Sequence, residues 1–268
     1  MNHTFVICAY QESQYLEDCI QSLKNQTVPC QIILTTSTPS EYLKILCQKY
    51  DISYRVREGE PGIAADWNYA LSQTHTEYVT IAHQDDVYEP DYLETVCNRI
   101  ATDKSALIAF SDYYELVNGI KYDNRTNLRI KRVLLYPLRK RKVQNRKWRK
   151  RWVLRYGNAI SCPTVTYHML LIRQVMQQNH REELFEDHFK SNLDWETWEW
   201  LSRQDGSFAY IPRCLMSHRI HTESETSAVI GDNRRTKEDY QMFRKFWPSW
   251  IAGILSGAYK SSEKSNAV

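Results

Sequence analysis

The 268-residue sequence has no apolar run of the roughly 18–20 residues that a membrane-spanning helix needs. The longest candidate, near Trp250–Tyr259, is too short and contains two glycines. The first residues carry neither the basic nor the apolar segment of an export signal, and a strand-like pattern begins at once. We therefore expect a cytoplasmic protein that is neither exported nor inserted into a bilayer.

Cysteine pairs at CxxC spacing are also absent. The seven cysteines are odd in number and scattered along the chain, which argues against both a disulfide framework and a zinc site. We expect most of them to be small apolar side chains buried in a reducing compartment.

Acidic residues are missing from one long segment, because no Asp or Glu occurs between Asp123 and Glu182. Within it, Arg129–Arg155 holds thirteen Lys and Arg residues, so a net charge of +3 leaves 3 − 13 = −10 for the rest of the chain. Apolar residues interrupt these charges, and Trp148 and Trp152 lie four apart, on one face of a helix. This pattern predicts docking on an anionic membrane. A solvated charged helix is the alternative. No nucleic-acid-binding motif accompanies the charge, so we expect no nucleic-acid partner.

The first hundred residues alternate between strand and helix patterns. Apolar runs at residues 5–9, 31–35, 53–56 and 78–82 predict strands, and amphipathic segments between them predict helices. The second helix is predicted to begin with Thr38 as N-cap and Pro39 as its first residue. Strands joined by single helices predict a parallel sheet, in which ligands bind at the carboxyl ends of the strands.

Two adjacent carboxylates, Asp85 and Asp86, follow the strand pattern at residues 78–82. A hard divalent cation with a bound diphosphate suits such a pair. Burying two carboxylates side by side is costly unless a cation neutralises them. An isolated pair of this kind is more often a solvated acidic turn, so the surrounding sequence decides between the two.

Four stretches, in the expected order, resemble family 2 glycosyltransferases, which have the GT-A fold. Residues 77–94 resemble the metal-binding segment of that family, 5–27 its opening strand and helix, 62–71 its glycine-to-asparagine helix, and Arg219–His221 with Ser224 its late Arg-Ile-His segment. The resemblance implies an inverting enzyme that uses Mn²⁺ or Mg²⁺. It would transfer a sugar from a nucleoside-diphosphate sugar, expected to be a UDP-sugar, to a glycan or polyprenyl-linked acceptor. Bacterial capsule, O-antigen or exopolysaccharide synthesis is the expected setting.

The fold implied is α/β, with a mostly parallel, Rossmann-like nucleotide-binding sheet flanked by helices and a helical, basic C-terminal extension. We expect residues 1–112 to form the nucleotide-sugar-binding half and 113–156 a basic amphipathic insertion. Residues 157–260 would form the acceptor-binding, catalytic half of the same domain, and 261–268 a tail.

The resemblance also implies roles for single residues. Metal ligands are expected at Asp85, Asp86 and His221. Asp194 is expected to be the catalytic base, with Glu196 in reserve, since residues two apart on a helix do not share a face. A helix-capping role is the alternative for Asp194. Nucleotide-sugar contacts are expected from Ala9, Tyr10, Glu12, Thr36, Asp66, Asn68, His83, Gln84 and Arg219.

The sequence departs from the family pattern in four places. One concerns the base, because an alignment back from Gly206 and Pro212 puts Asp194 one position early. His83 stands where the first acid of the Asp-x-Asp motif is usual, Thr35–Ser37 replaces an acidic loop, and Trp67 replaces an arginine. Two other hypotheses remain open: a non-catalytic relative that keeps the fold as a binding module, and a nucleic-acid-binding protein that uses the basic stretch.

Overall fold

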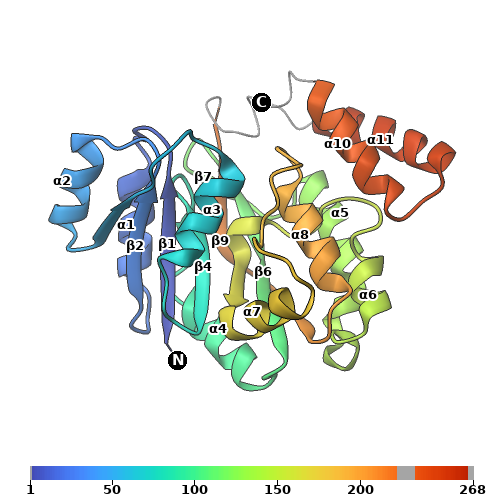
Figure 1. Cartoon of the computed structure of the whole chain (residues 1–268), viewed down its shortest axis with the longest axis horizontal. Helices are drawn as coiled ribbons and strands as arrows, with labels where there is room; N and C mark the ends of the chain where they lie inside the picture. The colour runs from blue at the N-terminus through green and yellow to red at the C-terminus, as the bar shows by residue number, and fades with distance from the viewer. Residues whose placement is uncertain (1, 222–232, 265–268) are drawn as a thin grey trace.

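The computed structural model describes residues 2–221 and 233–264 (Figure 1). Ser224, which the sequence comparison included, and the end of the tail lie outside these residues. The strands are β1 (His3–Ala9), β2 (Gln31–Thr36), β3 (Ser53–Val56), β4 (Tyr78–His83), β5 (Val87–Tyr88), β6 (Ala106–Val117), β7 (Ile120–Tyr122), β8 (Val165–His168) and β9 (Ser207–Ile220). The α-helices are α1 (Leu16–Lys24), α2 (Glu41–Lys49), α3 (Ile63–Ser72), α4 (Tyr92–Ala101), α5 (Thr126–Leu135), α6 (Lys147–Trp152), α7 (Met169–Gln178), α8 (Leu193–Ser202), α10 (Asn233–Arg244) and α11 (Ser249–Lys264). Short 3₁₀ turns are η1 (Tyr136–Arg139), η2 (Arg141–Val143) and η3 (Cys162–Thr164).

One sheet runs through the described part of the chain in the order β3-β2-β1-β4-β8-β6-β9-β5, with β7 paired to β6. The strands β3, β2, β1 and β4 are parallel, as the alternating sequence pattern predicts. β8 is antiparallel to both β4 and β6, and β9 is parallel to β6. The prediction of a mostly parallel α/β sheet is therefore confirmed.

Helices cover both faces of the sheet, which explains why its central strands are almost continuously apolar. In β1, Phe5 and Ile7 pack on one face with residues of α1, α2 and α4. Val6, which points the opposite way, packs with residues of α3, α7 and α8. All three side chains are fully buried, so β1 is the centre of the fold and its end is held rigidly.

Three element boundaries differ from the sequence-based expectation. The N-cap of α2 is Ser40, whose hydroxyl accepts a hydrogen bond from the backbone N–H of Leu43, so Pro39 lies before the helix. β6 continues to Val117, past the expected boundary at residue 112. β9 extends from Ser207 to Ile220, well beyond the strand-like apolar run that the sequence shows at residues 207–211, because its second half pairs with both β6 and β5.

The basic stretch is not one helix. It runs through α5, η1, η2 and α6, and Pro137 ends the α-helical part within η1. The segment contains no acid of its own, which predicts a block without local neutralisation, and this prediction is wrong for part of it. Arg132 lies 3.5 Å from the carboxylate of Asp112, Lys147 lies 2.9 Å from that of Asp205, and Arg151 pairs with Glu199. These acids come from distant parts of the chain.

The seven cysteines are free thiols, and fewer of them are buried than expected, because only Cys19, Cys47 and Cys162 are buried and the other four are half-buried. No helix in residues 2–221 or 233–264 combines the length and the apolar character needed to cross a membrane.

Candidate active site

Four segments bring polar side chains to one edge of the sheet. β1, β2 and β4 end there, because they are parallel neighbours. β9 runs in the same direction as β4, since β8 is antiparallel to both β4 and β6 and β9 is parallel to β6. The chain enters β9 directly from the end of α8, so the start of α8 lies at the edge where β9 ends (Figure 1).

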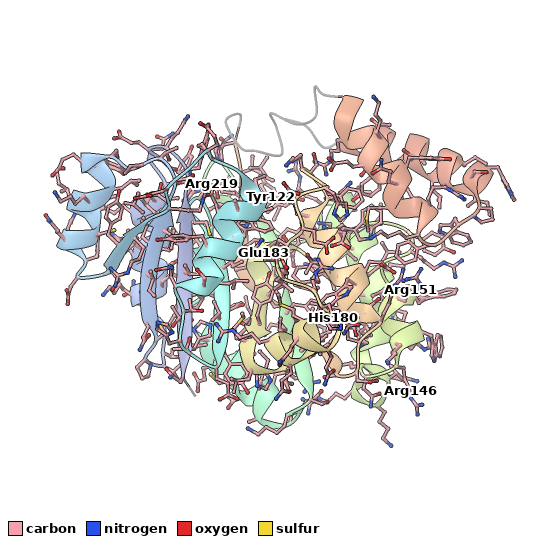
Figure 2. All side chains as sticks on the ribbon, viewed as in Figure 1. Tyr122, Arg146, Arg151, His180, Glu183 and Arg219 are labelled. Carbon is pink, nitrogen blue, oxygen red and sulfur yellow. The ribbon has the colours of Figure 1, made fainter. Side chains whose placement is uncertain are left out.

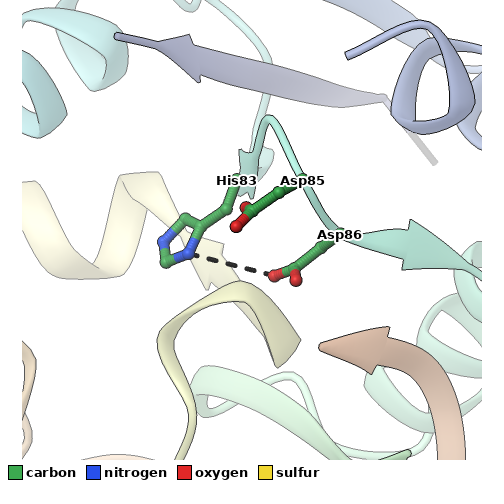
Figure 3. Close-up of side chains that lie close together, drawn as sticks. All are labelled: His83, Asp85 and Asp86. Atoms are coloured by element: carbon green, nitrogen blue, oxygen red, sulfur yellow. Dashed lines mark ion pairs between the residues drawn. The ribbon is translucent and has the colours of Figure 1, made fainter. Parts of the chain in front are cut away.

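The centre of this edge is formed by His83, Asp85 and Asp86, at and just after the end of β4 (Figure 3). One potential ligand atom from each lies within 4.8 Å of the others. The Asp86 side chain is fully buried, and its Oδ2 lies 3.9 Å from Nδ1 of His83. Asp85 and His83 remain partly exposed. Two carboxylates and an imidazole thus meet at the carboxyl end of a buried strand.

The two oxygens of Asp86 have different surroundings. Oδ1 accepts hydrogen bonds from Nδ1 of His218 and from the backbone N–H of Arg219, both at 3.0 Å. Oδ2 is buried and has no hydrogen-bond partner among the described residues, and the same holds for Nε2 of His83. Buried polar atoms are normally paired. A buried carboxylate oxygen without a hydrogen-bond donor, in a cluster of two carboxylates and an imidazole, fits a site for a divalent cation.

His218 is a site residue that the sequence analysis did not assign. The register of β9 places Ser217 opposite Val87, which brings His218 next to Asp86. Although burial opposes the charged imidazole, the carboxylates of Asp86 and Asp85 raise the pKa of His218 to about 9. The only signal in the sequence was the neighbouring Arg219–His221 segment, and the pairing of β9 with β5 is a long-range contact that no local pattern encodes.

Arg219 and His221 both reach Asp85. Nε2 of His221 lies 3.0 Å from Oδ2 of Asp85, and Nε of Arg219 donates to the backbone carbonyl of Asp85 at 2.9 Å. The Arg219 guanidinium also pairs with Asp18 at 3.0 Å and stacks over the ring of Tyr15. Burial opposes ionisation of Asp85, but His218, His83 and the hydrogen bond with His221 hold its pKa below the ordinary value.

The loops that follow β1, β2 and β4 are joined by side-chain hydrogen bonds. The Gln84 amide makes two with the backbone of Tyr10, at 2.9 and 3.2 Å. The backbone N–H of Gln11 donates to the hydroxyl of Thr38, which lies 3.3 Å from that of Thr36. Of the other predicted contacts on this side, Ala9 is buried in β1 and Glu12 is exposed. The three loops therefore form one connected rim.

Asp66 and Asn68, two residues of α3 that are predicted to contact the nucleotide sugar, form hydrogen bonds with other parts of the protein. Asp66 accepts from Nε of Arg57 at 2.6 Å and from the hydroxyl of Ser37 at 3.0 Å. The Asn68 amide donates to the carbonyl oxygen of Phe185 at 2.7 Å and accepts from its N–H at 3.0 Å. These contacts position the rim and the segment before α8, and direct contact with a nucleotide sugar stays a prediction for both residues.

Trp67 and His83, two residues at which the sequence departs from the family pattern, are in contact with each other. Their rings stack with centroids 5.6 Å apart, and Trp67 also packs edge-on against Phe185 at 4.9 Å. An aromatic ring thus orients the imidazole that stands where the family pattern has an acid.

Asp194 lies in the first turn of α8, whose N-cap is Asn192, so Asp194 is not the capping residue. Its Oδ2 accepts from the amide of Asn158 at 2.6 Å, and its Oδ1 accepts from the backbone N–H of Trp195 at 2.8 Å. Burial raises the pKa of Asp194 above its ordinary value, against the opposing effects of these donors and of the cations Lys131 and Arg235. Such a carboxylate is well suited to accept a proton.

Glu196 points elsewhere. One of its oxygens lies 2.9 Å from Nη2 of Arg181 and the other 3.2 Å from Nζ of Lys245. Against the effect of burial, these two cations hold the pKa of Glu196 below its ordinary value. The side chain is therefore part of an internal ion-pair network, and a catalytic role for it stays a prediction.

The charges of both Asp194 and Asp86 act on one buried thiol, that of Cys162. Burial raises the pKa of Cys162 in η3 well above its usual range, and the charges of Asp194 and Asp86 both raise it further. Both carboxylates therefore disfavour the charged form of the same thiol.

Comparison with known sequences identifies one family. The model described as Glycosyl transferase family 2 matches residues 4–163, more than half of the chain. Glycosyltransferase GlyA of Streptococcus pneumoniae serotype 4 is 27% identical over 116 residues. That match covers 41% of this chain and 16% of GlyA, so the chain spans less than one fifth of the length of this relative.

Two solved structures share the fold at low sequence identity. TarS 1–349 of S. aureus, in complex with UDP-GlcNAc, has a TM-score of 0.61 and 14% identity, covering 98% of this chain and 72% of that one. The mannosyltransferase PcManGT of Pyrobaculum calidifontis, in complex with GDP-Man and Mn²⁺, has a TM-score of 0.63 and 14% identity, covering 98% of this chain and 73% of that one. The GT-A fold expected from the sequence is confirmed.

Proposed function

Because this chain belongs to glycosyl transferase family 2, we propose that it transfers a sugar from a nucleoside-diphosphate sugar to an acceptor hydroxyl with inversion. A glycan or polyprenyl-linked acceptor and a role in bacterial surface polysaccharide synthesis are part of the proposal. The observation that carries it is the cluster of His83, Asp85 and Asp86 at the carboxyl end of β4, where a divalent cation could bind.

The donor proposed is a UDP-sugar, bound along the rim formed by the loops after β1, β2 and β4. TarS has been crystallised with UDP-GlcNAc and PcManGT with GDP-Man, which supports a nucleotide-sugar donor for this fold. On this chain, the exposed ring of Tyr10 and the Gln84 amide that fixes its backbone lie next to the acidic cluster. They are suited to hold the nucleoside, while the cluster faces the diphosphate.

Asp85 and Asp86, with His83 or His221 beside them, would hold Mn²⁺ or Mg²⁺. Carboxylate oxygens suit both ions, and an imidazole nitrogen suits manganese better than magnesium. When bound, the cation would neutralise charge that develops on the departing nucleoside diphosphate. His218 and the backbone of Arg219 donate hydrogen bonds to Oδ1 of Asp86 and so orient its other oxygen, Oδ2. Hydrogen bonds of this kind typically fix the orientation of a metal ligand and adjust its affinity for the ion.

The proton chemistry falls to Asp194. Its carboxylate would take the proton of the acceptor hydroxyl as that oxygen bonds to the anomeric carbon. The bond from that carbon to the diphosphate oxygen breaks at the same time, on the opposite face of the sugar, so the configuration inverts. A base with a raised pKa holds the proton more firmly than an exposed aspartate would. Asp194 lies in the first turn of α8.

Nucleotide binding tests this proposal. UDP with Mn²⁺ should raise the melting temperature of the protein, and a ligand at 100 times its Kd adds about 2.7 kcal/mol of stability. The measurement is a thermal-shift screen of UDP, GDP, CDP and dTDP, each with Mn²⁺ and with EDTA. If none of the four stabilises the protein, the proposal of a nucleotide-dependent transferase is contradicted. If stabilisation persists in EDTA, the proposed metal dependence of nucleotide binding is contradicted.

We also propose that the surface of the basic stretch docks on an anionic membrane, on the cytoplasmic side. Seven of its thirteen Lys and Arg residues are exposed, and these are Arg129, Arg139, Lys140, Arg141, Lys142, Arg146 and Lys147. Large apolar side chains are exposed among them, with Val133 at 71%, Tyr136 at 64% and Trp148 at 58%. Arg146 and Arg151 lie on the side of the molecule formed by α6, away from Arg219 (Figure 2). A lipid-linked acceptor would then reach the site without leaving the bilayer.

Neutralising the four consecutive basic residues at 139–142 with glutamine should abolish co-sedimentation with vesicles that contain anionic lipid. Each basic residue near such a surface contributes about 1 kcal/mol, so the loss of four reduces binding about 10²–10³-fold. Arg149–Arg151 is a poor target, because Lys150 is buried against the carbonyls of Gln204 and Gly206.

A matched control removes the same charge elsewhere, with glutamine at the exposed Lys24, Lys44, Arg55 and Lys104. This variant should sediment like the wild type, and binding should weaken at high salt. Equal binding to neutral vesicles, or equal loss in both variants, would contradict docking by the basic stretch.

A further inference from the structure

A turn before η3, Gly157-Asn158, has no role in the function proposed so far. Gly157 has φ +147°, and a Cβ there would lie 2.8 Å from the ring of Tyr259 on α11. The same ring lies 6.0 Å from that of Trp195 on α8 and 5.9 Å from that of Phe243 on α10, measured between centroids. Glycine thus lets the turn pass beneath Tyr259, and the turn is fixed against the helix that carries Asp194.

Asn158 makes one short side-chain hydrogen bond, from its Nδ2 to Oδ2 of Asp194 at 2.6 Å. Its Oδ1 is buried and has no hydrogen-bond partner among the described residues. An asparagine that served only the fold would be expected to satisfy its buried carbonyl oxygen as well. The contact of this amide is therefore directed at the carboxylate of Asp194.

The Asp194 carboxylate is held from two directions. The Trp195 N–H donates to Oδ1 from within α8, while Asn158 donates to Oδ2 from a different segment. Two donors on different oxygens fix the plane of the carboxylate. They leave about two of its four lone-pair positions for a proton or a hydroxyl.

Other ionisable groups act on Asp194 from the neighbouring elements. Lys131 of α5 and Arg235 of α10 favour its charged form. The charge of Asp194 in turn raises the pKa of the buried Cys162 of η3 and of Tyr167 of β8. These interactions act through the electric field around the carboxylate. Asn158 differs because it is neutral and bonded to one particular oxygen, so it can set the orientation of the carboxylate.

We propose that Asn158 is the positioning residue of the site, which holds the carboxylate of Asp194 in the orientation that receives the acceptor proton. The inference rests on the proposed role of Asp194 as the base. Without Asn158 the carboxylate keeps only its backbone donor, so it turns more freely and its charged form loses a hydrogen bond. Both effects should slow the chemical step and leave donor binding unchanged.

The direct test is the titration of Asp194 by carboxyl ¹³C NMR in protein labelled at aspartate. The signal absent from the Asp194→Asn spectrum identifies the residue. In Asn158→Ala the midpoint should move to higher pH by about one pH unit or more, the scale of a lost hydrogen bond to a charged group. Asn179→Ala, which removes an exposed amide at the C-cap of α7, should leave the midpoint in place. An unchanged midpoint in Asn158→Ala overturns the inference. Should that variant not fold, Asn158→Ser, whose shorter side chain also loses the contact, takes its place.

Donor cleavage separates this inference from the proposed base. The acidic limb of the pH–rate profile should shift to higher pH in Asn158→Ala, with the KM for the donor unchanged. In the Asp194→Asn background the same substitution should have no further effect, because Asn158 acts through Asp194. A full additional loss there overturns the positioning role alone. Wild-type cleavage by Asp194→Asn would instead overturn the base.

Discussion

Replacing Asp85 with asparagine should abolish Mn²⁺-dependent binding of the nucleotide donor and leave the fold nearly intact. The pKa of Asp85 is held below its ordinary value, so its carboxylate is charged at neutral pH and can bind a cation. Loss of a residue that only orients a metal ligand costs about 10–100-fold in metal affinity, so loss of a ligand should cost about 100-fold or more. Without the ion, removing one of two adjacent negative charges costs the fold little.

The measurement is isothermal titration calorimetry of UDP into the protein in Mn²⁺, with circular dichroism as the check on folding. Asp91→Asn removes a carboxylate that pairs with Arg213, away from the acidic cluster, and should bind UDP like the wild type. Unchanged affinity in Asp85→Asn would falsify the assignment of Asp85 as the principal metal ligand.

Asp194→Asn should lower kcat by about 10²–10⁴-fold with little change in donor affinity, the usual scale of general base catalysis. Burial raises the pKa of Asp194, and the base works only when it is deprotonated. The wild-type rate should therefore rise with pH through a midpoint above the ordinary aspartate value, and Asp194→Asn should lose this acidic limb. Initial rates of donor cleavage from pH 4 to 8 provide the measurement.

Glu196→Gln is the matched control for that experiment, on the same helix two residues away. It leaves Arg181 and Lys245 without their shared carboxylate inside the protein. Breaking a buried ion pair on one side costs about 3–5 kcal/mol, so we expect lower stability rather than slower chemistry. A well-folded Glu196→Gln variant with the kinetic defect predicted for Asp194→Asn would move the base to Glu196.

The part of the fold that could be predicted from the sequence is the part built from local patterns. The strands β1 to β4 are short apolar runs separated by single helices, and their parallel order follows from that alternation. The pair Asp85 and Asp86 could be placed at the carboxyl edge for the same reason. β6, β8 and the second half of β9 could not be predicted, because each is defined by partners far away in the chain.

The same limit explains the site residues that were missed. His218 contacts Asp86 across 132 positions, through the pairing of β9 with β5. Asn158 contacts Asp194 across 36 positions, through a turn held beneath Tyr259. In the basic stretch the charges can be counted from the sequence but their partners cannot, because Asp112 and Glu199, which pair with Arg132 and Arg151, lie outside the stretch.

The central claim is that this chain cleaves a nucleoside-diphosphate sugar with metal-dependent inversion. Time-resolved ¹H NMR of UDP-glucose, UDP-GlcNAc and GDP-mannose, each with the protein and Mg²⁺ in place of the paramagnetic Mn²⁺, tests it most directly. We predict that at least one α-linked donor is consumed, that the first sugar released to water is the β-anomer, and that EDTA stops the reaction. Release of the α-anomer first, or cleavage that continues in EDTA, would contradict the account.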